Sequence, residues 1–463
     1  MKSPLGALLV AIAFACAFSV TKGAAQDAAA PQWCAGAAAV VITPDKPIWM
    51  AGYAARTKPA EGKLTDLWAK ALWLRDAEGQ QAVLVTLDVV GVDRPIGLAI
   101  RQRIVTEHGL PLANVILATS HTHSGPVVAG NLRPMHLDVV PPAEQEKILA
   151  YSKRLEESVL EAVKLAKEKA APAVLQFGHG LATFAVNRRN NGEGAVPDLR
   201  ARGRLVGPFD HDVPVLVVRD LEGAPQAIVF GYACHATVLD GYQWCGDYPG
   251  YAQIEVEKAF PGAVALFAAG CGADQNPIPR RQTELAATYG AALARAVVDA
   301  VAAPMPPVAP KFAAQYVEIP LTLAQIPGRE QLAQEQKSDN PYVAARAKHL
   351  ARQLEEKGKI DSEYPYPIAR WRLGQEIDWW FLGGEVVVDY ALRLRLDAAP
   401  QDRTKIWATA YANDVMAYIP SRRVHREGGY EGGGAMLYYG LPSPWTEDVE
   451  DRIFAQVRAW TEP

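Results

Sequence analysis

The sequence predicts an α/β fold in which a mixed sheet core is flanked by helices, built as a single large catalytic domain with a helical insertion. Short apolar runs alternate with longer amphipathic segments between residues 82 and 301, and this alternation is typical of α/β proteins. With 463 residues, of which 49% are hydrophobic, the chain can bury a core of the size such a fold requires.

Each element is predicted from its apolar pattern. A short run of apolar residues bounded by polar or turn residues indicates a buried strand, whereas apolar residues at helical spacing over ten or more positions indicate a helix. Strands are expected at 82–90, 115–118, 215–218, 227–232, 264–268 and 379–382, and helices at 95–108, 144–170, 251–259, 282–301 and 386–394.

Three further segments concern the organisation of the chain. The proline-rich stretch 303–310 either separates two sub-domains or crosses the surface of one. Residues 328–359 are highly charged and predict a pair of helices with a solvated face, which is the helical insertion. Residues 427–434 are rich in glycine and predict a loop, and we expect the catalytic domain to span residues 32–463.

The first 25 residues have the pattern of a secretory signal peptide. Lys2 precedes an apolar run from Leu5 to Val20, and small residues at 23–25 form a cleavage site. The run is too short to span a membrane, so we expect no transmembrane segment. The sequence therefore predicts a secreted or periplasmic protein.

Cysteine usage and charge narrow the function further. Four cysteines follow the signal segment, and Cys234 with Cys245 is a plausible disulfide in an oxidising compartment. The chain has no Cys-x-x-Cys pair, which argues against a cysteine-based zinc site. The formal net charge is −4 with no basic stripe, so we expect no nucleic-acid partner.

Two histidines, His121 and His123, follow the predicted strand 115–118 directly. Because alternate side chains of an extended chain share one face, both imidazoles can point into one cavity. Such a pair suits two metal ligands, or a ligand with a catalytic neighbour, although hydrogen-bonded core histidines give the same pattern.

His235 and Glu385 also lie where predicted strands end, and strand ends of an α/β sheet meet in one crevice. Taken alone, His235 is more simply a core histidine, and Glu385 is equally well a helix first-turn residue. Two histidines and one glutamate nevertheless form a familiar catalytic zinc set. Asp247 and Asp274 lie in tight turns, where capping of the loop is the simplest interpretation and support of metal ligands is the alternative.

Taken together, these motifs resemble the N-terminal catalytic domain of the neutral/alkaline non-lysosomal ceramidase family, over roughly residues 35–445. The order and spacing of several short motifs carry the resemblance. They are Ser120-His-Thr-His-Ser-Gly-Pro126, Asn187-Arg188, Cys234-His235-Ala-Thr237, Gly246-Asp-Tyr-Pro-Gly-Tyr-Ala252, Gly384-Glu385, and Tyr418 with Tyr430-Glu431-Gly432.

The resemblance implies a zinc hydrolase of amide bonds with one Zn²⁺ per chain. Ceramidases of this type carry a further C-terminal β-sandwich domain, which we expect this chain to lack. Its implied site divides into metal ligands and non-ligand catalytic residues. The ligands would be His121, His235, Glu385 and Tyr418, and the catalytic residues would be His123, Arg188 and Tyr430.

The leading hypothesis is therefore a secreted zinc amidohydrolase that cleaves an N-acyl bond in ceramide or a related small-molecule or lipid substrate. One alternative keeps the fold and the metal but cleaves an ester or the N-acetyl group of a sugar. Another is a non-catalytic binding protein with a vestigial metal site. Asn276 stands where the family has a serine, which excludes a serine nucleophile at that position.

Overall fold

The computed structural model describes residues 32–461, so the predicted signal peptide at 1–25 lies outside the described residues. The described residues belong to one compact unit. The first part of the chain forms β1 (Trp33–Val41), β2 (Gly62–Lys63), β3 (Trp68–Arg75), β4 (Gln81–Leu87), α1 (Arg94–His108), η1 (Leu112–Asn114), β5 (Val115–Thr119), α2 (Pro142–Glu168), β6 (Ala171–Leu181), β7 (Ala185–Asn187), η2 (Glu193–Ala195), α3 (Val196–Ala201), β8 (Asp212–Arg219), β9 (Pro225–Tyr232), β10 (Gln243–Trp244), α4 (Asp247–Ala259), β11 (Val264–Ala269), β12 (Gln275–Pro277) and α5 (Thr283–Ala302).

The remaining elements complete a second sheet and the covering helices. They are β13 (Phe312–Thr322), α6 (Arg329–Glu335), α7 (Pro341–Lys357), β14 (Glu363–Leu373), β15 (Ile377–Leu382), β16 (Glu385–Val386), α8 (Asp389–Asp397), η3 (Pro400–Lys405), β17 (Ile406–Thr409), β18 (Tyr418–Ile419), α9 (Arg422–Glu427), the π-helical turn η4 (Tyr430–Gly434), α10 (Met436–Tyr439) and α11 (Val449–Thr461).

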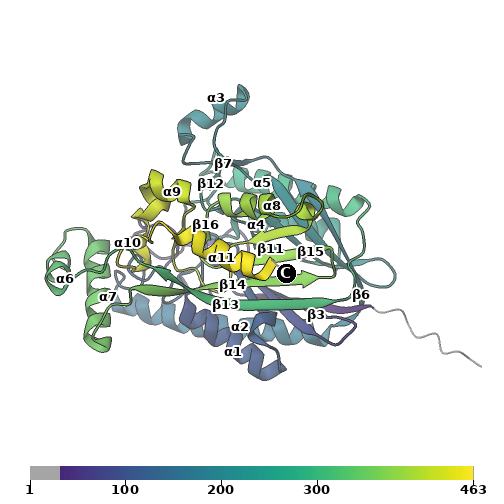
Figure 1. The fold of residues 1–463 in the computed structure, drawn as a ribbon, viewed down its shortest axis with the longest axis horizontal. Coiled ribbons are helices and arrows are strands. Elements are labelled where there is room, and N and C mark those ends of the chain that lie inside the picture. The colour runs from purple at the N-terminus through teal and green to yellow at the C-terminus, as the bar shows by residue number, and fades with distance from the viewer. Residues whose placement is uncertain (1–31, 462–463) are drawn as a thin grey trace, which may run out of the picture. The chain divides into compact units, whose positions relative to one another are not determined.

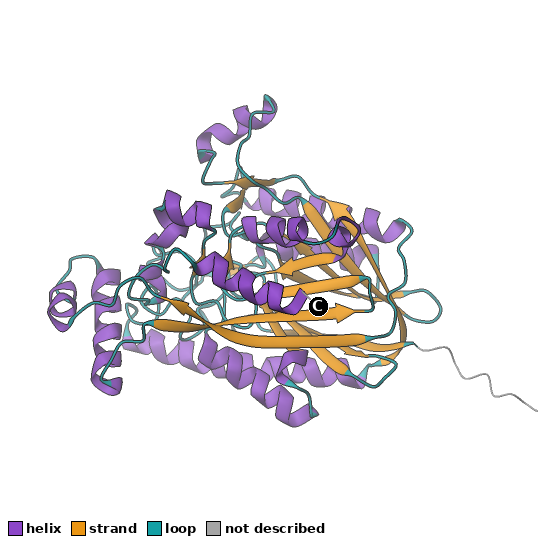
Figure 2. Cartoon of the chain, viewed as in Figure 1, coloured by secondary structure: helices purple, strands orange, loops and turns teal. Residues whose placement is uncertain are grey.

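Two sheets dominate the fold. The larger has eight strands in the order β11-β9-β8-β6-β1-β3-β4-β5, and the smaller has four in the order β13-β14-β15-β17. Parallel pairs β4–β5, β9–β11 and β15–β17 occur among antiparallel ones, so both sheets are mixed. Figure 1 shows α1 and α2 on one side of the strands and α4, α5 and α8 on the other, and Figure 2 shows the same layers by element type.

The two sheets pack face to face around an aromatic core. Trp379 and Phe381 of β15 point inward with Trp407 of β17, and the stacked rings of Trp379 and Trp407 are 3.8 Å apart. The alternate residues Trp380 and Leu382 point outward onto the core beneath α8 and α11. Because these strands are covered on both faces, their sequences read as continuous apolar runs rather than alternating ones.

The larger sheet consists of two halves that meet through a short pairing of β1 with β6 at Trp33–Ala35. The far edge strand of one half lies against the other half, since Nζ of Lys70 in β3 donates to the carbonyl of Ala265 in β11 at 2.8 Å. This arrangement explains how segments that follow β5 and β9 reach one site although these strands are not neighbours.

The helical insertion lies between β13 and β14 and consists of α6 and α7. Asn340 caps α7, because its side-chain oxygen accepts a hydrogen bond from the amide of Tyr342 at 3.0 Å, and Pro341 occupies the first turn. The helix ends at Gly358, whose φ of 74° is the left-handed conformation that favours glycine.

Among the described residues, one helix is long and apolar enough to cross a membrane by length and composition. This helix is α5, and half of its most apolar window is buried. Leu293 and Val297 of α5 belong to the main hydrophobic core, as expected for a core helix of a folded domain.

The predicted α/β class, the mixed sheet and the helical insertion are confirmed. The proline-rich segment 303–310 runs beside β6, where Val308 donates its amide to the carbonyl of Leu175 at 2.8 Å. Three local predictions were wrong. The helix expected at 386–394 begins at Asp389, because Glu385 and Val386 pair with β18. The loop expected at 427–434 contains the end of α9 and a π-helical turn. The expected disulfide between Cys234 and Cys245 is not formed, since Cys34, Cys234, Cys245 and Cys271 are all free thiols.

Candidate metal centre

The predicted metal ligands lie close together because each of them is at or near the end of a strand. His121 lies two residues after β5, and His235 lies three residues after β9. Glu385 begins β16, where it pairs in parallel register with Tyr418 of β18. Gly384, with a φ of 74°, makes the turn before Glu385, and a Cβ there would lie 2.7 Å from the carbonyl oxygen of Ala417. Glycine at the first position of the Gly384-Glu385 motif is therefore required sterically.

The backbone at the centre is strained. His121 has a φ of 58°, and Tyr411, whose ring stacks on the His121 imidazole at 4.4 Å, has a φ of 54°. Non-glycine residues adopt this left-handed region rarely, and strained residues of this kind cluster at functional sites, where the surrounding structure holds them. The turn at His121 directs its imidazole away from the path of β5 toward the other ligands.

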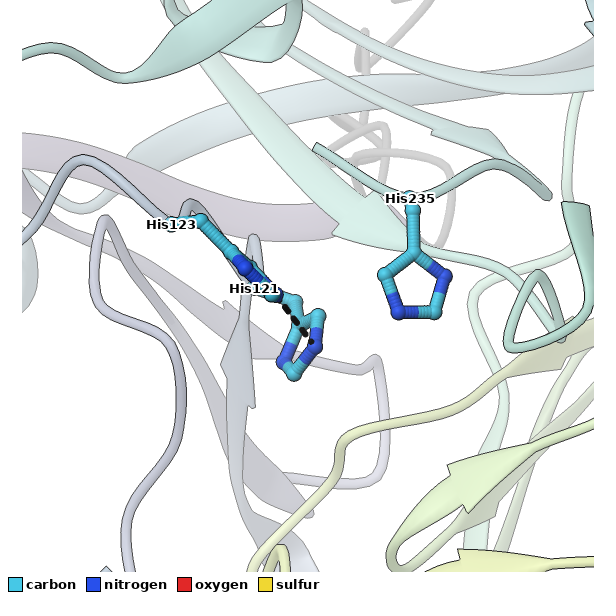
Figure 3. Close-up of side chains that lie close together, drawn as sticks. All are labelled: His121, His123 and His235. Carbon is cyan, nitrogen blue, oxygen red and sulfur yellow. Dashed lines mark hydrogen bonds between the residues drawn. The ribbon is translucent and has the colours of Figure 1, made fainter. Parts of the chain in front are cut away.

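The side chains of His121, His235 and Glu385 converge within hydrogen-bonding distance. Oε2 of Glu385 lies 3.0 Å from Nε2 of His121 and 3.0 Å from Nε2 of His235. His123 joins the group, since its Nε2 is 3.2 Å from Nε2 of His121. Figure 3 shows the three imidazoles gathered in one region, and their nearest ring nitrogens lie within 4.8 Å of one another.

The donor set fits a metal cation. Nδ1 of His121 faces the carbonyl of Val90 at 2.5 Å, and Nδ1 of His235 faces the carbonyl of Gly272 at 3.0 Å. A carbonyl accepts only, so each Nδ1 carries the proton and each Nε2 presents a lone pair. Two lone pairs and a carboxylate oxygen then face one another with no proton between them, and a cation resolves this repulsion. Imidazole and carboxylate are ligands that zinc shares with other divalent metals.

The electrostatics keep His123 and His235 neutral. Burial, with a further contribution from the Arg188 guanidinium, lowers the pKa of His235 to about 4. Burial and the neighbouring histidines hold the pKa of His123 well below its usual range. Neutral imidazoles are the form that binds metals and accepts protons.

Tyr418 completes the predicted ligand set. Its hydroxyl lies 3.2 Å from Nε2 of His235 and accepts a hydrogen bond from Nη2 of Arg188 at 3.0 Å. Nε of Arg188 donates to Glu431 at 2.7 Å, and Glu431 also accepts from Nη1 of Arg189 at 2.6 Å. Arg188 is thereby fixed between the centre and a carboxylate.

Tyr430 lies at the edge of the centre. It is 46% exposed, and its ring centroid is 5.3 Å from that of Tyr418. Desolvation by the surrounding protein and the nearby carboxylate of Glu385 raise the pKa of Tyr430, so the phenol stays protonated and can donate a hydrogen bond. The structure therefore brings all seven predicted site residues into one region.

Two buried aspartates hold the loops that carry the centre. Asp247 accepts hydrogen bonds from the amides of Val238 and Leu239 at 3.2 and 2.9 Å, just after His235. Asp274 accepts from the amide of Val388 at 2.9 Å, just after Glu385. Each aspartate joins a tight turn to a segment that carries a predicted ligand. Each one therefore caps a loop, as first expected, and also supports a ligand, which was the alternative.

Several residues that the sequence did not indicate touch the centre. The hydroxyl of Tyr439 donates a short hydrogen bond to Oε1 of Glu385, and Tyr411 stacks on His121. Tyr53 packs its ring edge against His123 at 4.8 Å, and Gly52 lies directly beneath the same imidazole. None carries a local sequence signal, because each meets its partner only through the tertiary fold.

Substituting Gly52 with alanine is expected to displace His123. Gly52 has a φ of 97°, and a Cβ there would lie 2.4 Å from Cγ of His123. We expect Gly52→Ala to cost about 1–3 kcal/mol of unfolding free energy and to reduce turnover. Gly79→Ala is the matched control, because Gly79 has a φ of 88° and no atom within 4 Å of its added Cβ. Equal stability and activity in the two variants, measured by urea denaturation and amide hydrolysis, would contradict the predicted contact.

Comparison with known proteins identifies the family. A family model described as "Neutral/alkaline non-lysosomal ceramidase, N-terminal" matches residues 35–292, more than half of the chain. A structure described as "Ceramidase complexed with C2" is 17% identical, with a TM-score of 0.70, and covers 92% of this chain and 74% of its own. The neutral ceramidase from Pseudomonas aeruginosa is 19% identical, with a TM-score of 0.69, and covers 92% of this chain and 73% of its own. The chain belongs to the neutral/alkaline non-lysosomal ceramidase family and is a hydrolase of the C–N bond of linear amides.

Proposed function

We propose that this protein is a zinc-dependent hydrolase that cleaves the N-acyl amide bond of ceramide or a related N-acylated molecule. The observation that carries the proposal is the convergence of Nε2 of His121, Nε2 of His235 and Oε2 of Glu385 without a proton between them. These three groups, with the hydroxyl of Tyr418, would hold one zinc ion per chain. A zinc ion there supplies Lewis acidity, which polarises an amide carbonyl and makes water more acidic.

His123 is proposed to move the protons of the reaction. Its neutral imidazole lies beside the ligands, with Nε2 facing the centre and Nδ1 buried without a hydrogen-bond partner. Nε2 accepts a proton from the attacking water and then donates it to the nitrogen of the leaving amine as the C–N bond breaks. Such general acid–base transfer contributes about 10²–10⁴ in rate.

Arg188 and Tyr430 are proposed to bind the carbonyl side of the amide. The Tyr430 phenol is protonated and partly exposed, so it can donate a hydrogen bond to the oxygen that gains charge. Arg188 orients the Tyr418 hydroxyl and adds positive charge close to that oxygen. Both groups stabilise negative charge that develops during the attack.

The export of the protein is part of the proposal. Residues 1–25 are proposed to be a cleaved signal peptide, and residues 32–463 the hydrolase domain that acts in the periplasm or outside the cell. Amino-terminal sequencing of protein recovered from the periplasm or the medium tests this point. A mature start close to residue 26 supports it, whereas cytoplasmic protein that retains Met1 contradicts it.

A substrate panel tests the chemistry. We expect fatty-acid release from N-acylsphingosine, and we expect Tyr430→Phe to reduce kcat by about 10²–10³ because one oxyanion donor is lost. Tyr438→Phe is the matched control, since Tyr438 lies one ring farther from Tyr418, with its centroid 6.3 Å from that of Tyr430. Activity confined to short esters or N-acetyl sugars would contradict cleavage of an N-acyl lipid.

A further inference from the structure

Two cavities flank the metal centre. The first, here called the Tyr430 cavity, has a volume of about 420 Å³, and the second, the Tyr53 cavity, has a volume of about 330 Å³. Arg280 lines both. The other lining residues that matter here are Arg188, Arg189, Glu193, Tyr430 and Glu431 in the first cavity, and Tyr53, Arg56, Asp240 and Arg281 in the second.

Both cavities adjoin residues of the centre. Tyr430 and Arg188 line the first, and Arg188 donates to the hydroxyl of the predicted ligand Tyr418. Tyr53 lines the second, and its ring packs against His123. A substrate whose amide lies at the centre can therefore place its neighbouring groups in these cavities.

The Tyr53 cavity carries an excess of positive charge. Three arginines line it together with one aspartate, Asp240, which lies 3.4 Å from Nε of Arg281. Glu193 serves two guanidinium groups, since it accepts from Nη2 of Arg280 at 2.8 Å and also binds Arg281. The charged side chains that line this cavity are therefore three guanidinium groups and one carboxylate, while the buried Asp247 lies behind Tyr53 and already accepts hydrogen bonds from the backbone.

Arg56 is the least compensated of these groups. It is 6% exposed, and its two Nη atoms donate to the carbonyls of Ala51 and Gly241. Its Nε is buried and has no partner among the described residues, and the buried hydroxyl of Tyr53 also has none. A buried donor without a partner needs an acceptor, and an anion would supply one at a cavity lined mainly by guanidinium groups.

The cavity wall is held in place by its own contacts. Arg281 has a φ of 76°, and its amide donates to the carbonyl of Val238 at 2.5 Å. Nε and Nη2 of Arg280 both donate hydrogen bonds to the carboxylate of Glu193, at 3.1 and 2.8 Å, which holds this guanidinium group in place. Such preorganised guanidinium groups suit the oxygens of carboxylate or phosphate.

We propose that the Tyr53 cavity binds an anionic group carried by the amine portion of the N-acyl substrate. The proposal rests on the proposed amide hydrolysis. The acyl portion of an N-acyl lipid is hydrocarbon, which leaves the amine portion to carry the charge. The favoured substrates are therefore N-acyl amino acids or phosphorylated N-acyl amines, in which a carboxylate or a phosphate contacts Arg280, Arg281 and the donors of Arg56 and Tyr53.

The test compares two substrates of equal acyl length, N-dodecanoylglycine and the uncharged N-dodecanoylethanolamine. We expect wild-type protein to show at least about a tenfold higher kcat/KM for the anionic substrate. Arg280→Gln is expected to reduce this preference by about tenfold to a hundredfold, mainly through KM, because a hydrogen bond to a charged group is lost. Arg295→Gln is the control, since Arg295 is exposed on α5 and pairs with Asp299.

The outcomes separate the two proposals. Hydrolysis of neither substrate, nor of ceramide, would overturn the proposed function. Equal hydrolysis of charged and uncharged substrates, with no change in Arg280→Gln, would overturn the anion site and leave the amidase standing. If Arg280→Gln unfolds, Tyr53→Phe is used, with a reduced anionic preference expected. Comparing N-dodecanoylglycine with ceramide 1-phosphate then identifies whether carboxylate or phosphate is the preferred anion. If neither of these substrates is hydrolysed with a higher kcat/KM than ceramide, the proposal is contradicted.

Discussion

Removing bound metal with a chelator is expected to abolish amide hydrolysis, to lower the midpoint of thermal unfolding, and to be reversed by zinc. The loss of activity should be at least about a thousandfold, since Lewis-acid chemistry contributes several kcal/mol and each 1.4 kcal/mol is a factor of ten. The loss of stability follows from the centre, where His121, His235 and Glu385 face one another as acceptors once the cation is gone. A ligand at about a thousand times its dissociation constant stabilises a protein by about 4 kcal/mol.

The control for this experiment is the double variant His121→Ala/His235→Ala under the same treatment. It is expected to have neither the activity nor the response of the unfolding midpoint to zinc. Undiminished hydrolysis by wild-type protein, after elemental analysis has shown that its metal is gone, would contradict a metal-dependent mechanism.

Replacing His123 with alanine is expected to reduce kcat by about 10²–10⁴ while metal binding is retained. The reason is that His123 is proposed to carry the proton, whereas Nε2 of His121 and His235, with Glu385, hold the ion. The His123 imidazole lies between Tyr53 and His121, at ring distances of 4.8 and 4.9 Å, and we expect its removal to leave the four proposed ligands in place.

Metal content decides the role of His123, because its ring nitrogen also lies within the group of histidines that could bind a metal. His179→Ala is the matched control, since His179 pairs with Asp212 at 2.8 Å and belongs to β6, outside the centre. Loss of metal together with activity in His123→Ala would assign His123 as a ligand and contradict the proposed division of roles.

The sequence predicted the parts of the centre that follow strands. The apolar runs before His121 and His235 mark buried strands, and the ends of such strands are where an α/β sheet displays functional residues. The family motifs supplied Arg188, Tyr418 and Tyr430, which no periodicity distinguishes from packing residues. All of these side chains meet in the structure.

The contacts that the sequence did not predict depend on long-range packing. Tyr439 reaches Glu385 across 54 positions, and the stacking of Tyr411 on His121 joins segments far apart in the chain. The start of α8 was placed too early, because the pairing of Glu385 with Tyr418 extends the chain where helix propensity alone favours a turn of helix. Local pattern contains no information on such pairings.

Two long strands of the smaller sheet were also missed by the sequence analysis. β13 and β14 pair along eleven residues, yet neither strand was predicted, since their polar and aromatic residues resemble neither a buried run nor a simple alternation. The inward-facing residues of these strands, among them Phe312 and Trp371, are buried because the larger sheet covers them.

The most direct test of the central claim is the metal content of the purified protein, measured by elemental mass spectrometry after exposure to a mixture of divalent metals. We predict about one zinc per chain in the wild type and almost none in His121→Ala/His235→Ala, with the His179→Ala control unchanged. A wild-type protein that holds no metal under these conditions, or a double variant that holds as much as the wild type, would contradict the assignment of this centre as a metal site.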